Sequence, residues 1–455
     1  MTVVEAGAVK GLRGSRNALG LCLLACLLVG GATQRGVLVD AILQMIVIAG
    51  AAYALMSAQM TKPMRAGIVL LVLILVLGIM QLLPLPLTLL ELARPADLLP
   101  FVGNDLSEAV SAAPISLSVS RTVEATIFAL APVVFFIAAV SLPQEKIANL
   151  LPFFVIGLVC NLIAGGLQYS FSTDATLGDL LGYGVMVGMF ANVNHFSTLV
   201  FASLPLIVYF GFFHDRAAIA TLLLVLTFLV LLAAGSRAGI LIGLGVVAIS
   251  VGSLIWRGRV GTIAMVVLFA SFAAYGYGAL IQIGSQQLDP DFGRKEFALT
   301  TWNAILDNWV WGTGFGTFDL VYPAYEKRDM VHNLYVNHAH NDFLELLLEG
   351  GAAAMVVFAV YVAMVIVRAV KVYNRPLQRL ALLSIVVILL HSIVDYPLRT
   401  MAIAMTFAFF NVLFFSDIGT RPGLRKGYED KRRRAREEVL PPYANGRRED
   451  LHDFQ

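Results

Sequence analysis

Residues 217–234 read AAIATLLLVLTFLVLLAA and residues 238–256 read AGILIGLGVVAISVGSLIW, with only Gly235, Ser236 and Arg237 between them. Neither stretch contains a charged residue. Each is close to the roughly 20 apolar residues that a helix needs to cross a bilayer. Two such stretches separated by three residues predict a pair of membrane-spanning helices joined by a very tight turn.

The composition of the whole chain agrees with this local pattern. Of its 455 residues, 58% are hydrophobic and 14% are charged, and the mean hydropathy is +0.80. Soluble domains carry about 25% charged residues, so an ordinary soluble enzyme is excluded, as is a disordered protein. Cys22, Cys26 and Cys160 all lie in apolar runs and therefore predict neither a disulfide framework nor a zinc site. The net charge of +2 gives no reason to expect a nucleic-acid partner.

Apolar runs recur along the chain, and about twelve of them are candidates to span a membrane. They lie near 18–33, 37–56, 66–87, 122–142, 149–170, 195–213, 217–234, 238–256, 262–284, 343–367, 378–394 and 400–415. The sequence thus predicts an all-α polytopic membrane protein with about 12 transmembrane helices and a large late periplasmic loop of short helices. We expect three parts, a cytoplasmic N-terminus (1–17), a transmembrane domain (18–415) and a polar tail (416–455).

The distribution of lysine and arginine predicts the orientation. Most of the 32 basic residues fall on one side if both termini are cytoplasmic, as the positive-inside rule requires. The tail contributes many of them, mixed with acids, and predicts a partly disordered extension. The first run is compatible with an uncleaved anchor or with a cleaved signal peptide.

The longest loops fall on the opposite, outer side, near 88–121, 171–194 and 285–341. The sequence contains no Walker A motif and no dinucleotide fingerprint. We therefore expect the catalytic and substrate-binding side chains to face outward and to need no cofactor.

Two histidines precede three acids at the end of the late outer loop. They are His338 and His340, followed by Asp342, Glu345 and Glu349. The acids are spaced i, i+3, i+7, which places them on one face of a helix. A histidine beside carboxylates suits general-base chemistry near neutral pH. Solvated loop histidines are an equally simple interpretation, and a metal site is a third, although alternating loop residues define no specific coordination geometry.

Three outer arginines are candidates to bind phosphate. Arg237 lies in the tight turn, Arg294 opens a helix-like stretch toward Trp302, and Arg399 follows the eleventh run. The planar guanidinium suits bidentate contact with phosphate, whereas the competing interpretation is snorkelling toward lipid headgroups.

Further polar residues lie at the same ends of the apolar runs. Asn192 and Asn194 could contact sugar hydroxyls or cap a helix, and Asp395 follows the eleventh run. The glycines of residues 312–316 predict turns between two loop helices, because no buried strand precedes them.

These motifs together carry a resemblance. The stretch from His340-Asn341-Asp342-Phe343-Leu344-Glu345 to Glu349-Gly350-Gly351 resembles the signature of the O-antigen ligase and polymerase superfamily. Supporting segments are Ile115–Ser118, Phe190–Asn194, Ser236–Gly239, Gly312–Gly316 and Asp395–Pro397, so that the resemblance covers about 110–415.

The resemblance implies a metal-independent glycosyltransferase of the bacterial inner membrane with a periplasmic active site. Its donor would be a glycan on undecaprenyl diphosphate, and its acceptor a glycan, lipid A-core or protein, with polysaccharide-export machinery as a further partner. It implies catalytic roles for Arg237 and His340, with His338 as the alternative base. It leaves a substrate-binding role for Arg294, with Arg399 as the second choice, and for Asn192, Asn194, Asp342, Glu345 and Asp395.

Polymerase and ligase activities are both compatible with the sequence, because both join the same donor to a hydroxyl. A lipid-linked glycan flippase or another polytopic transporter is the alternative class. Such transporters usually show internal repeats and charged groups at mid-membrane, whereas here no repeat is evident and the polar residues gather at one side.

Overall fold

The computed structural model describes residues 3–34, 36–56, 61–91, 94, 111–171, 186–213, 217–255, 270, 273, 276–278, 280–281, 293–327 and 336–418. Residues 1–416 form one compact unit and residues 417–455 a second. All the helices and strands named below belong to the first unit.

Nearly all regular structure in this unit is helical. The helices are α1 (Val3–Val29), α2 (Leu38–Leu55), α3 (Lys62–Leu82), α4 (Leu87–Glu91), α5 (Val119–Ser141), α6 (Gln144–Ala148), α7 (Leu151–Phe171), α9 (Val193–Phe213), α10 (Ala217–Ala234), α11 (Arg237–Ile255), α13 (Arg294–Asn308), α14 (Phe318–Tyr325), α15 (Asp342–Val372), α16 (Pro376–His391) and α17 (Met401–Phe415), with a 3₁₀ turn, η4 (Pro397–Arg399). The all-α prediction is thus confirmed, apart from one small antiparallel pair, β1 (Pro84–Pro86) with β2 (Ala112–Pro114). β1 lies at the end of the predicted run 66–87, and β2 lies in the predicted outer loop near 88–121.

Six helices of the described residues are long and apolar enough to cross a membrane. They are Leu38–Leu55, Lys62–Leu82, Val119–Ser141, Gln144–Tyr169, Val193–Gly211 and Asp342–Val372. Four shorter apolar helices lie at Ala218–Ala234, Gly239–Ser250, Pro376–His391 and Met401–Phe415. A polytopic membrane protein is supported, but the expected number of 12 is not confirmed. Most of the predicted run 262–284 falls outside the described residues.

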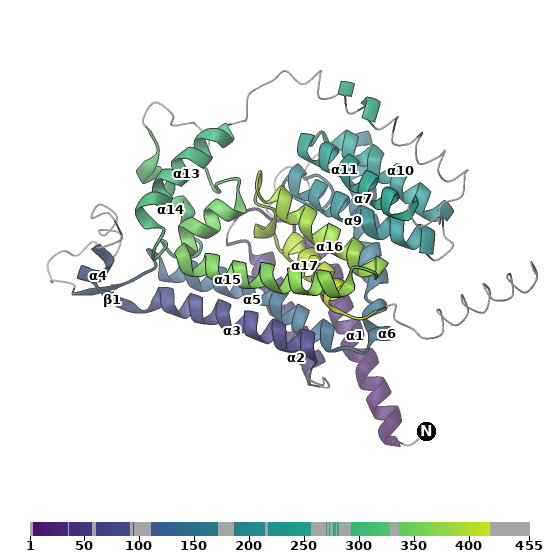
Figure 1. The fold of residues 1–455 in the computed structure, drawn as a ribbon, viewed down its shortest axis with the longest axis horizontal. Coiled ribbons are helices and arrows are strands. Elements are labelled where there is room, and N and C mark those ends of the chain that lie inside the picture. Colours follow the sequence, from purple (N-terminus) through teal and green to yellow (C-terminus); the bar gives the residue numbers. More distant parts are fainter. Residues whose placement is uncertain are drawn as a thin grey trace, which may run out of the picture. The chain divides into compact units, whose positions relative to one another are not determined.

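The helices pack in two groups around α17 (Figure 1). On one side α2 and α3 both pack on α5; on the other, α9 contacts α10, α11 and α16. Helix α17 is buried along its whole length and contacts α1, α5, α9 and α16. It therefore forms the centre of the unit, and its N-terminal end lies beside η4.

Helix α15 is interrupted one-third of the way along. Gly351 adopts φ 61° and ψ −161°, a conformation that is open essentially only to glycine. The carbonyl groups freed by this break accept hydrogen bonds from the glycine-rich loop, Thr313 N to Leu348 O and Gly314 N to Glu349 O, both at 2.9 Å.

Residues 312–316 connect α13 to α14, as the sequence predicts. Gly312, Gly314 and Gly316 all have positive φ, at 73°, 102° and 80°. A Cβ at Gly312 would lie 2.4 Å from Glu349 O, so the loop approaches the break in α15 too closely for a side chain. The glycines therefore fix a turn against α15 rather than a nucleotide site.

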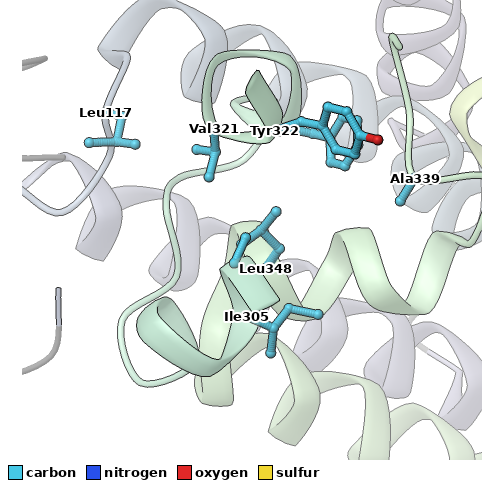
Figure 2. Packing of buried hydrophobic residues seen from close by; sticks show 8 residues of the cluster. Leu117, Ile305, Val321, Tyr322, Ala339 and Leu348 are labelled. Carbon is cyan, nitrogen blue, oxygen red and sulfur yellow. The ribbon is translucent and has the colours of Figure 1, made fainter. Parts of the chain in front are cut away.

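The short helices of the late loop have their own apolar core (Figure 2). Ile305 of α13, Val321 and Tyr322 of α14, and Leu348 of α15 are all buried in it. Ala339 is 1% exposed in the same core. Because Ala339 lies between the two loop histidines, this core anchors the backbone from which both project.

Candidate active site

Four separate segments meet at the carboxylate of Asp395, between α16 and η4. Asn194 Nδ2 of α9 donates a hydrogen bond to Asp395 Oδ2 at 2.7 Å, and Arg294 Nη2 of α13 lies 3.5 Å from the same oxygen. The other oxygen, Oδ1, lies 3.5 Å from His340 Nδ1 and 3.6 Å from His195 Nε2. Asp395 is fully buried, so its charge depends on these neighbours.

The electrostatics of the cluster keep Asp395 ionised. Burial alone would raise the pKa of Asp395, but the imidazoles of His195 and His340, which lie 3.6 and 3.5 Å from Oδ1, hold its pKa well below the usual range. Next to it, burial and the charge of Asp395 raise the pKa of Tyr396 to about 12, so the Tyr396 phenol stays protonated. The site thus offers one fixed negative charge.

His340 occupies a strained backbone position. Among the residues that the structure describes, it is the one non-glycine residue with a positive φ, which is 50°. This conformation is several-fold enriched in histidine but is costly for most side chains. Asn341 then caps α15, because its side chain accepts hydrogen bonds from Phe343 N and Leu344 N at 3.0 Å. The His340 side chain is 22% exposed and packs between the rings of Phe297 and Tyr396. An oriented, accessible imidazole beside a carboxylate is the arrangement of a general base.

His338 forms a second histidine–carboxylate pair. His338 Nδ1 donates to Glu345 Oε1 at 2.8 Å, and Glu345 Oε2 accepts from Ala339 N at 3.0 Å. Glu345 is fully buried, and His338 stacks on Tyr396 with ring centroids 4.2 Å apart. Both loop histidines therefore contact the same tyrosine ring and are held by different carboxylates.

Arg399 is surrounded by the three acids predicted to share a helix face. Its Nη1 donates to Glu349 Oε2 at 2.9 Å and lies 3.3 Å from Glu345 Oε1, while its Nε lies 3.7 Å from Asp342 Oδ1. The prediction of one shared face is confirmed. Burial alone would lower the pKa of Arg399, but the three carboxylates raise it above the ordinary value. This guanidinium is thus engaged by the protein itself.

Asp342 ties the start of α15 to the segment after α16. Its backbone N–H donates to Ser392 O at 2.9 Å, and its Oδ2 accepts from Ser392 Oγ at 2.8 Å and from Leu398 N at 3.2 Å. These bonds hold His340 and Asp395 close together.

Of the two remaining arginines, the structure describes the side chain of Arg294 but not that of Arg237. Arg294 is the first residue of α13, and its side chain is 34% exposed. Arg237 opens α11 directly after the turn at Gly235 and Ser236, as predicted, but its side chain lies outside the described residues. Of the two, only Arg294 is therefore seen to reach Asp395.

Asn192 caps a helix, whereas the Asn194 side chain links two other segments. Asn192 Oδ1 accepts from Asn194 N at 2.7 Å, at the start of α9. Asn194 Oδ1 accepts from Ser236 Oγ at 2.8 Å, and Ser236 Oγ accepts from Gly239 N at 3.1 Å. The tight α10–α11 turn is thereby linked through Asn194 to Asp395, which connects the neighbourhood of Arg237 to the cluster.

Three residues that contact the site in the structure were not among the predicted site residues. Tyr396 contacts both loop histidines, His195 lies against Asp395, and Phe297 contacts His340. Tyr396 and His195 directly follow predicted site residues in the sequence, which is a usable signal. Phe297 carries none, because it is an ordinary aromatic residue of α13.

The described residues contain no group of three or more histidine, cysteine, aspartate or glutamate side chains arranged to hold a metal ion. They form many apolar helices, as expected of a membrane protein. The ionisable groups of α9, α13, α15 and η4 gather at one end of these helices.

One known family matches part of the chain. Residues 222–359 match the family model described as O-Antigen ligase, which confirms the resemblance to the O-antigen ligase and polymerase superfamily. The matched segment contains Arg237, Arg294, His338 and His340, whereas Asp395 lies outside it. No curated protein matches the chain. The family implies a membrane enzyme that transfers glycans from a lipid-linked donor to an acceptor.

Proposed function

We propose that this protein transfers a glycan from undecaprenyl diphosphate onto an acceptor hydroxyl, at the periplasmic face of the bacterial inner membrane. It acts as a polysaccharide polymerase or ligase, with both termini in the cytoplasm. The observation that carries the proposal is the convergence of His340, Arg294 and Asn194 on the single buried carboxylate of Asp395.

The acceptor hydroxyl is activated by His340. Its imidazole takes the hydroxyl proton as the acceptor oxygen attacks the anomeric carbon of the donor. Asp395 stabilises the imidazolium that forms and keeps the ring oriented, since Oδ1 faces Nδ1 at 3.5 Å. His338 is the alternative base, because Glu345 orients it in the same manner.

The diphosphate leaves from the opposite face of the sugar. The anomeric carbon–oxygen bond breaks, and its electron pair goes to undecaprenyl diphosphate, so the anomeric configuration inverts. Arg294 and Arg237 stabilise the developing negative charge. Arg294 suits this role better than Arg399, because Arg399 already neutralises Asp342, Glu345 and Glu349.

The proposed reaction needs neither a metal ion nor a nucleotide. Charge on the leaving group is met by arginine, and the proton goes to a histidine. The side chains of four residues already make hydrogen bonds within the protein, so each can add only single contacts to the sugars of the donor. They are Asn192, Asn194, Asp342 and Glu345.

The experiment is mass spectrometry of lipid-linked glycans from cells lacking the protein, with surface labelling to determine their side of the membrane. Accumulated single repeat units on the periplasmic face support a polymerase, and accumulated long chains there support a ligase. Glycans accumulated on the cytoplasmic face would overturn the enzyme assignment in favour of a flippase.

A further inference from the structure

An elongated cavity of about 700 Å³ runs between α2, α3 and α5 on one side and α15 and α17 on the other. We call the part of it that is lined by His338, Asp342 and Arg399 its mouth. Arg294, His340 and Asp395 are not among the described residues that line it. The cavity therefore adjoins the proposed active site on the His338 side, away from the arginine proposed to hold the diphosphate.

The walls of the cavity are suited to a hydrocarbon chain. Phe128 and Val133 of α5, Val357 and Phe358 of α15, and Ala408 of α17 all line it. On α17 the lining extends from Ala404 to Phe415, which is about 16 Å at the helical rise of 1.5 Å per residue. A volume of this size lies within the range of specific ligand pockets.

The charges at the mouth disfavour a diphosphate. Arg121 is ion-paired with Asp319, and Arg399 with three carboxylates. Asp40 and Glu124 also line the cavity, so acids outnumber bases around it. A diphosphate would meet net repulsion here, whereas hydroxyl groups would find acceptors.

One of these acceptors lacks a partner. The buried Oδ1 of Asp40 accepts no hydrogen bond from any described residue. A buried polar atom without a partner is costly, and an O–H donor from a ligand would satisfy it. Gln34 and Thr33 line the same region and add further hydrogen-bonding groups.

We propose that this cavity binds the hydrocarbon anchor of the acceptor, a lipid whose head at the mouth carries hydroxyl groups and no diphosphate. Of the two activities proposed above, this occupant fits the ligase, because a polymerase joins repeat units that are both linked to undecaprenyl diphosphate. The inference rests on the proposed function, because it assigns one of the two substrates of that reaction. Donor and acceptor then approach the histidine pair from opposite sides, with the donor diphosphate at Arg294 and the acceptor head beside His338.

The test uses two photoreactive probes of different charge on the full chain in nanodiscs. One is an alkyl glucoside with a diazirine in its chain, and the other is a farnesyl diphosphate with a diazirine. Peptide mass spectrometry maps the labelled residues. We expect the glucoside to label the α15 and α17 walls, and excess farnesyl diphosphate to leave this labelling unchanged.

Variants establish which labelling is specific. Ala408→Trp fills the cavity and should reduce glucoside labelling about tenfold, whereas Val356→Trp, at a position of α15 that is 64% exposed, should leave it unchanged. Asp40→Leu replaces the carboxylate with an apolar group and removes the acceptor for a ligand hydroxyl. A folded Asp40→Leu protein should therefore lose glucoside labelling severalfold.

The outcomes separate the inference from the proposed function. Arg294→Ala should lower transfer by about 10²–10³-fold yet leave glucoside labelling intact. Labelling of the walls by farnesyl diphosphate would overturn the inference. So would equal labelling by a diazirine phosphatidylethanolamine, whose head carries no hydroxyl group, because the cavity would then hold bulk membrane lipid. Wall labelling by the glucoside in a wild-type protein without any transferase activity would overturn the proposed function alone.

Discussion

His340 Nδ1 lies 3.5 Å from Oδ1 of the fully buried Asp395, at the junction of four chain segments. The relationship is costly to build, because His340 holds a positive φ and Asp395 is removed from water. Under the proposed function, this cost orients one base beside one diphosphate-binding arginine.

Replacing Asp395 with asparagine should lower the rate of glycan transfer by about 10²-fold, since the histidine loses the charge that stabilises its protonated form. Because the folded-state pKa of Asp395 lies below the ordinary value, its carboxylate is charged throughout the range from about pH 5 to 8 and loses this charge only as pH falls through the lower folded value. The measurement is the ratio of wild-type to variant initial rates at about pH 8. A variant that transfers as fast as the wild type would contradict this electrostatic assignment.

Replacing Arg294 with alanine should lower transfer by about 10²–10³-fold, the usual effect of removing one group that stabilises developing charge. Arg294→Lys should restore part of the rate, because a point charge remains without the bidentate geometry. Lys295→Ala is the matched control, since Lys295 is the neighbouring basic residue and is exposed. Initial rates with purified donor measure the effect. Equal losses at Arg294 and Lys295 would point to a general electrostatic effect of the surface.

Arg399→Ala should chiefly affect stability. Removing this cation leaves Asp342, Glu345 and Glu349 buried without their shared counter-ion, and breaking buried pairs typically costs about 3–5 kcal/mol. We expect a lower amount of protein in membranes and a lower melting temperature in detergent. Arg399→Lys keeps the charge and should be milder. If Arg399→Ala were to fold normally and lose only activity, Arg399 would instead be a phosphate-binding residue.

Gly351→Ala should destabilise the late loop. Its φ of 61° and ψ of −161° are essentially restricted to glycine, and an added Cβ would lie 2.6 Å from Gly312 N. The expected cost is at least about 1–3 kcal/mol. Gly245→Ala is the control, because a Cβ there meets nothing within 4 Å. Thermal unfolding in detergent compares the two, and equal melting temperatures would contradict the structural role of the break in α15.

Chelation should leave the rate unchanged, because the proposed reaction uses arginine and histidine in place of a metal ion. The measurement is transfer after treatment with EDTA and after re-addition of magnesium. Strict dependence on a divalent ion would revive a metal site at His338, His340 and Asp342.

Local features of this protein could be predicted from the sequence. The tight turn at Gly235 and Ser236, the shared face of Asp342, Glu345 and Glu349, and the turns at the glycines of residues 312–316 all follow from periodicity or from glycine chemistry. Each depends on residues that are close together in the chain.

Long-range pairing could not be predicted in the same way. The sequence makes Arg399 a candidate phosphate ligand, whereas the structure places it within reach of acids about 50 residues away in the chain. The different partners of His338 and His340 depend on Ala339 being buried in the core of the late loop. The expected number of membrane spans is not confirmed either, because apolar composition gives candidate spans without fixing where each helix ends.

The proposed function depends above all on His340 acting as the base for transfer from a lipid-linked glycan. Mass spectrometry of polyprenyl-linked glycans tests this role in cells that carry His340→Ala in place of the wild-type protein, with His338→Ala in parallel and protein amounts matched. We expect His340→Ala cells to accumulate the lipid-linked glycan as strongly as cells that lack the protein completely. Wild-type glycan levels in His340→Ala cells would contradict the assignment of His340 as the base.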